Sequence, residues 1–62
     1  MKTLKDYEIN TQMVEITIEK GTIVQVILLP KEKAIERYSN SIVIEYYEYK
    51  ENDITYVTLK GE

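Results

Sequence analysis

Residues 13–30 read MVEITIEKGTIVQVILLP, and this stretch decides the fold. Apolar and polar side chains alternate over residues 14–19, and a period of two is typical of a half-buried β-strand. Residues 22–29 are rich in β-branched side chains, which favour strands. Gly21 lies between the two runs and supplies the positive φ that a tight turn requires. The stretch therefore predicts an antiparallel hairpin that closes near Lys20 and Gly21.

A proline and a polar triplet mark the limits of the next element. Pro30 ends the second strand because it has no backbone N–H to donate, and proline suits the first turn of a helix. Residues 31–39 predict a short helix with its apolar side chains on one stripe. The triplet Ser39-Asn40-Ser41 ends this helix.

A second hairpin follows the helix. Residues 42–49, IVIEYYEY, and residues 54–60, ITYVTLK, both predict strands, and the polar residues 50–53 between them are typical of a turn. The predicted fold class is therefore α+β with the order ββαββ, in which two antiparallel hairpins flank one short α-helix. Residues 1–62 are predicted to form a single small domain, in which residues 1–12 are a flexible arm or an extra edge strand.

Small size and the lack of covalent staples point to self-association. Folding of a chain of 62 residues buries only roughly 60% of the surface of the unfolded chain. The sequence has no Cys for disulfides or thiolate metal sites and no His for imidazole ligation. Oligomerisation is the remaining common way to stabilise so small a domain. We therefore expect a homodimer, either intertwined or packed sheet on sheet.

Charge and hydropathy narrow the range of partners. The net charge is −3, and the negative charge is concentrated in residues 41–62. Nucleic-acid binding depends on Lys and Arg side chains that neutralise phosphates, so nucleic acid is a disfavoured partner. The first residues lack the apolar region of a signal peptide, and no apolar run approaches the roughly 20 residues that span a bilayer. We expect a cytoplasmic protein without a membrane partner.

Strict alternation divides the second hairpin into two faces. One predicted face is apolar and belongs to the core; it carries Ile42, Ile44, Tyr46, Val57 and Leu59. The opposite face mixes aromatic, aliphatic and acidic side chains; it carries Val43, Glu45, Tyr47, Tyr49, Ile54 and Tyr56. We therefore expect a partner to cover the second face.

The first hairpin has the same two-sided character. Val24, Val26 and Leu28 lie on the face opposite to its core residues. A helix of about nine residues is roughly 13 Å long and covers only part of one sheet face. A second copy of the chain is the simplest cover for the rest. The candidates for the dimer interface are Val24, Val26, Leu28, Val43 and Ile54.

The residues that usually carry catalysis are missing. Without His or Cys, the commonest general base and the most nucleophilic side chain are absent. Glu45 and Glu48 are three positions apart on a strand and so lie on opposite faces, which excludes a cooperating pair. Residues 51–53 offer oxygen ligands, but three residues do not make the twelve-residue calcium loop. We expect no enzyme activity, no cofactor and no metal site.

The tyrosines are the strongest candidates for a functional surface. Tyrosine supplies a large, rigid contact area with a polar tip, and aromatic side chains are enriched at interface cores. Three uses remain open for Tyr47, Tyr49 and Tyr56: a core beneath the helix together with Tyr38, a homodimer interface, or a site for another protein. Stacking of nucleobases on these rings is disfavoured by their acidic neighbours.

One partial resemblance bears on the fold. The sequence carries Lys20-Gly21, Leu29-Pro30-Lys31-Glu32 and Glu36-Arg37 in the order hairpin, helix, hairpin. In this it resembles the AbrB/MazE swapped-hairpin family of DNA-binding regulators and antitoxins. Gly21 and Pro30 are further apart than that pattern usually has them, and the arginines of its DNA-contacting first half are absent. The resemblance implies an intertwined dimer of hairpins more than it implies DNA binding.

The sequence thus leads to two functional hypotheses. The first is a small, acidic, non-enzymatic protein-binding module, an inhibitor or adaptor of the kind that mobile elements encode, which docks on a basic protein surface. Its candidate partner-binding residues are Tyr47, Tyr49, Tyr56, Glu45, Glu48 and Glu51. The second is a dimeric swapped-hairpin DNA-binding regulator or antitoxin, which would use the basic residues Lys20, Lys31, Lys33 and Arg37.

Overall fold

The predicted ββαββ order is confirmed in a computed structural model that describes residues 1–61 of the chain. The first hairpin comprises β1 (Met13–Lys20) and β2 (Ile23–Pro30), and the second comprises β3 (Val43–Tyr49) and β4 (Ile54–Lys60). Helix α1 (Lys31–Tyr38) connects the two hairpins. Gly21 has a φ of 62°, the left-handed conformation that the first turn requires.

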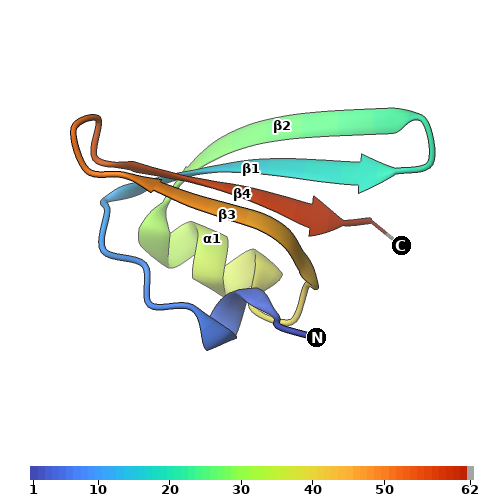
Figure 1. Cartoon of the computed structure of the whole chain (residues 1–62), viewed down its shortest axis with the longest axis horizontal. Coiled ribbons are helices and arrows are strands. Elements are labelled where there is room, and N and C mark those ends of the chain that lie inside the picture. The colour runs from blue at the N-terminus through green and yellow to red at the C-terminus, as the bar shows by residue number, and fades with distance from the viewer. Residues whose placement is uncertain (62) are drawn as a thin grey trace.

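The two hairpins join into one mixed sheet with the strand order β2-β1-β4-β3 (Figure 1). Strands β1 and β4 pair in parallel at the centre of this sheet, so the two hairpins of one chain together form its four strands. Beyond the last paired residues, the Gly61 N–H donates to the Glu19 carbonyl oxygen at 2.7 Å. A Cβ at Gly61 would lie 2.7 Å from the Cβ of Lys20, so this close approach requires glycine.

One face of the sheet is covered by α1 and by the N-terminal segment, which both lie on the same side (Figure 1). The buried apolar core lies between these layers and comprises Leu4, Ile9, Val14, Ile16, Ala34, Val57 and Leu59. We call the other side of the sheet the open face. Nothing in residues 1–61 covers the open face.

The N-terminal segment packs against the sheet and, apart from an isolated bridge between Thr3 and Ile42, forms no regular strand. It contains a short 3-10 helix, η1 (Leu4–Asp6), and buries Leu4 and Ile9 in the core. The Leu4 and Lys5 N–H groups donate to the carbonyl oxygens of Ser41 and Ser39 at 3.1 and 3.0 Å. The segment is therefore part of the domain. Its apolar residues have no period, which is why alternation could not find them.

A β-bulge changes the faces of β3. Val43 lies opposite Leu59, but Glu45 lies opposite Thr58, so Ile44 is an extra residue on this strand. Val43 consequently packs against the core, while Ile44 is 50% exposed. The sequence-based assignment of these two residues was therefore wrong: Val43 is a core contact, and Ile44 is not.

A pair of buried threonines links the N-terminal segment to the sheet. The Thr11 and Thr55 hydroxyl oxygens are 2.7 Å apart, and the Thr11 hydroxyl donates to the Met13 carbonyl oxygen at 2.9 Å. Both residues are buried. Thr11 therefore makes two of these hydrogen bonds and Thr55 makes one, while a further contact of Thr55 with the Tyr46 phenol acts to lower the pKa of that phenol.

We expect Thr11→Val to cost more stability than Thr55→Val. Thr11→Val leaves the Met13 carbonyl and the Thr55 hydroxyl without this partner, and a buried polar group without a partner costs about 1–3 kcal/mol. Urea denaturation of both single variants and of the double variant measures the difference. The double variant should cost less than the sum of the single ones, because no hydroxyl then remains buried at this position. Equal effects of the two single substitutions would contradict this assignment.

Candidate functional site

Three tyrosines gather at one end of the open face. Tyr47 lies directly opposite Tyr56 on the neighbouring strand, and Tyr49 lies opposite Ile54. The rings of Tyr49 and Tyr56 meet edge to face with their centroids 5.3 Å apart. Together with Asn52, the three tyrosines line a shallow hollow of about 340 Å³. We call Tyr47, Tyr49, Ile54 and Tyr56 the tyrosine patch.

The tyrosine patch is exposed because α1 lies on the other side of the sheet. Tyr47 and Tyr49 are 57% and 51% exposed, while Tyr38 packs against the core on the covered face. The interpretation that these rings form a core beneath the helix is therefore wrong. The two other uses, an interface with a second copy or with another protein, stay predictions.

Aliphatic side chains extend the open face along β2. Val24, Val26 and Leu28 are more than half exposed there, and Ile54 belongs to the tyrosine patch. These four of the predicted interface residues thus share one face. Val43, the fifth, does not, because the bulge turns it to the core.

The predicted acidic residues divide between the two faces. Glu45 lies on the open face opposite Thr58, and Glu51 is exposed in the turn beside the tyrosine patch. Glu48 lies on the covered side of β3, where its carboxylate accepts from the Asn10 side-chain amide at 3.3 Å. Of the predicted partner-binding residues, Glu48 therefore lies on the opposite side of the sheet from the tyrosine patch. Among the described residues, no three carboxylates lie close enough to hold a metal ion together.

Strand β1 adds two carboxylates to the open face that the sequence analysis did not single out. Glu15 lies opposite Tyr56, and Glu19 lies opposite Lys60. The sequence did not identify Glu15 and Glu19 as residues of the same face as the tyrosines, because it did not predict the parallel pairing of β1 with β4. By register, the charged residues that the four strands place on the open face are Glu15, Glu19, Glu45 and Lys60, so this face carries more acidic than basic residues.

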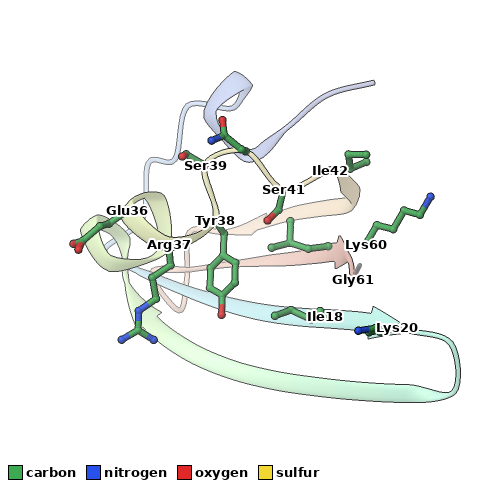
Figure 2. Close-up of a pocket in the computed structure, with 12 residues that line it drawn as sticks. Ile18, Lys20, Glu36, Arg37, Tyr38, Ser39, Ser41, Ile42, Lys60 and Gly61 are labelled. Carbon is green, nitrogen blue, oxygen red and sulfur yellow. The ribbon is translucent and has the colours of Figure 1, made fainter.

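Several basic residues border a groove of about 720 Å³ at the end of α1 (Figure 2). Lys20, Arg37 and Lys60 all line this groove, and Tyr38 forms part of its wall. Lys20 and Arg37 were expected from the sequence, whereas Lys60 was not; it lines the same groove because β4 pairs with β1. Of the other two basic candidates, Lys33 forms an ion pair with Glu36 at 3.7 Å, and Lys31 belongs to a different hollow.

Two further tyrosines stack on the covered side of the molecule. The rings of Tyr7 and Tyr46 lie 4.2 Å apart and nearly parallel, and the Tyr46 hydroxyl donates to the Glu8 carbonyl oxygen at 3.3 Å. Burial raises the pKa of the Tyr46 phenol above its ordinary value, and the charge of Glu48 raises it further. Tyr46 is therefore a structural residue that fastens the N-terminal segment to β3.

The raised pKa of Tyr46 predicts a loss of stability in alkali. The folded protein holds the phenolic proton more tightly than the unfolded chain, so this stabilisation is complete below about pH 10 and is lost as the pH rises through the folded-state pKa. We expect the urea midpoint to fall in that range, and Tyr46→Phe to reduce the fall. Tyr47→Phe, which removes a phenol from the open face, is the matched control. An identical alkaline profile for Tyr46→Phe and the wild type would contradict the prediction.

Comparisons with protein-family models, with curated proteins and with solved structures found no match to this chain. The one α-helix of the described residues is also too short and too polar to cross a membrane.

Proposed function

We propose that this chain is a non-enzymatic protein-binding module that uses the tyrosine patch, with Glu15, Glu45 and Glu51 around it, to dock on a basic protein surface. One observation carries the proposal: three tyrosines lie together on a sheet face that nothing in residues 1–61 covers. Large exposed apolar patches with a polar rim are typical of protein interaction sites.

The chemistry of the surface favours a cationic partner. Tyrosine rings attract Lys and Arg side chains through their π-faces, and Arg is itself enriched at interface hot spots. The carboxylates of Glu15 and Glu45 flank the rings and complement positive charge. A module of this size that covers a basic surface suits an inhibitor or an adaptor of the kind that mobile elements encode.

The test is capture of partners with matched variants. The wild type, the double variant Tyr47→Ser/Tyr49→Ser and the control Ile23→Ser are immobilised and exposed to a lysate of the native host. We expect one basic protein to be retained by the wild type and by the control, and to be lost from the double variant. Ile23 is a fair control because it is an exposed apolar residue at the far end of β2. Retention of the same protein by the double variant would refute the role of the tyrosines.

Circular dichroism of the three proteins separates loss of binding from loss of fold. Tyr47 and Tyr49 are half exposed on the open face, so their replacement should leave the secondary structure intact. An isothermal titration with the purified partner then measures the effect. We expect the double variant to bind at least about a hundredfold more weakly, because aromatic hot spots cost about 2 kcal/mol or more each when truncated.

DNA binding is the second candidate, and the basic groove favours it. Lys20, Arg37 and Lys60 line it together with Glu36, although the chain as a whole is acidic. A gel shift on random duplex DNA at low salt tests it, since phosphate contacts are strongest there. Binding that Arg37→Ala weakens would support this candidate, and no shift at low salt would exclude it.

A further inference from the structure

The two edges of the sheet differ in how they are protected. At the β3 edge, the Val43 N–H donates to the Lys2 carbonyl oxygen at 2.9 Å, and Thr3 forms a bridge with Ile42. The bulge at Ile44 further interrupts this edge, and bulges are one way in which proteins prevent strand addition. The β3 edge is therefore closed in part by the chain itself.

The β2 edge has none of these devices. Its pairing with β1 is regular over all eight residues, Ile23–Pro30, and none of them is charged. Natural edge strands are usually short, charged or bulged, because an unprotected edge is a template for another strand. Ile23, Val24, Val26 and Leu28 are each more than half exposed along it. The β2 edge is thus both open and apolar.

The hydrogen bonds of β1 show which backbone groups of β2 are free. The Glu19 carbonyl oxygen and the Met13 N–H both point to the β4 side, toward Gly61 and Asp53. Successive residues of a strand point to alternate sides, so the even-numbered residues of β1 point to β2. Their partners on β2 are odd-numbered. The N–H and C=O groups of Val24, Val26 and Leu28 therefore point away from the sheet.

We propose that β2 pairs with β2 of a second copy, antiparallel and about a two-fold axis at Val26. In this register, Val26 lies opposite Val26 of the second copy, and Val24 lies opposite Leu28 of the second copy. All three pairs are then of the hydrogen-bonded type, so each of the six free groups gains a partner. The result is one continuous eight-stranded sheet.

The sequence of the strand favours a second copy over a different chain. An isologous contact needs a surface that is complementary to itself, and the apolar pairs Val24–Leu28 and Val26–Val26 meet this condition. The strand carries no charge, so antiparallel self-pairing places no like charges opposite each other. A two-fold axis perpendicular to the sheet also leaves both tyrosine patches uncovered, at the two far ends of the sheet. The inference is therefore independent of the proposed function.

Analytical ultracentrifugation tests the proposal with two variants. Val26→Lys places two ammonium groups opposite each other at the two-fold axis, and we expect it to weaken the dimer at least about tenfold. Ile44→Lys, an exposed apolar residue on the other edge strand, should leave the dimer intact. A wild type that stays monomeric up to millimolar concentration, or a dimer that persists in Val26→Lys, would overturn the proposal.

Amide hydrogen exchange keeps the proposal testable if Val26→Lys fails to fold. We expect the amides of Val24, Val26 and Leu28 in the wild type to become more protected as the protein concentration rises, while the amide of Ile44 does not change. Protection that does not depend on concentration would overturn the proposal. Protection that grows only over the tyrosine patch would show a face-to-face dimer and would overturn it as well.

Discussion

Val43→Asp is expected to unfold the protein, whereas Ile44→Asp should leave it folded. Val43 is partly buried against the core opposite Leu59, and an aspartate there would lose much of the hydration of its carboxylate without gaining a partner. Such a charge costs several kcal/mol. A domain of 62 residues has a total stability of about 3–9 kcal/mol. The substitution at Val43 therefore removes most of the stability that the domain has.

Ile44→Asp is a matched control because it introduces the same residue one position later. Ile44 is half exposed, so the added carboxylate stays hydrated, and the expected cost is about 1 kcal/mol or less, mainly from strand propensity. Circular dichroism and urea denaturation measure both variants. Strict alternation along β3 predicts the reverse order of damage. A more damaging Ile44→Asp would mean that the bulge is absent in solution.

Strand β3 shows which side-chain orientations could be predicted from the sequence and which could not. Alternation placed Tyr47 and Tyr49 on one face correctly, because the bulge lies before them and the pairing is regular from Glu45 to Tyr49. The same rule failed at Val43 and Ile44, because one inserted residue reverses the side on which every earlier residue lies. No glycine or other turn residue marks the bulge in the sequence.

Local sequence patterns could not predict how the two hairpins join into one sheet. Each hairpin is specified by its own turn, Gly21 in one and residues 50–53 in the other. The parallel contact of β1 with β4 joins segments about forty residues apart, and neither strand carries a signal for its partner. For this reason Glu15 was not recognised as a neighbour of Tyr56, and Lys60 was not recognised as part of the basic groove.

Strand β2 shows both what the local sequence pattern predicts and what only the pairing of distant strands determines. Its run of apolar residues was recognised from the sequence as needing cover on two sides, and the exposure of Val24, Val26 and Leu28 shows that one side lacks it. Only the sheet order reveals that β2 is an edge strand. Because β2 lies at the edge, the backbone N–H and C=O groups of these three residues also point away from the sheet. Free backbone groups allow a second strand to pair with β2, whereas exposed side chains alone would allow only packing against the sheet face.

Leu4→Ala is expected to cost about 2–5 kcal/mol, although Leu4 lies in a polar segment without a periodic pattern. The Leu4 side chain is fully buried in the core with Ile9 and Ala34, and its truncation leaves a cavity between the N-terminal segment and the sheet. Met1→Ala is the control, because Met1 is fully exposed and should change the urea midpoint little. The loss should appear in the same single transition as global unfolding, since the segment belongs to the one core. A separate, early transition in Leu4→Ala, or no change in the urea midpoint, would instead show that residues 1–12 form an arm that the sheet does not need.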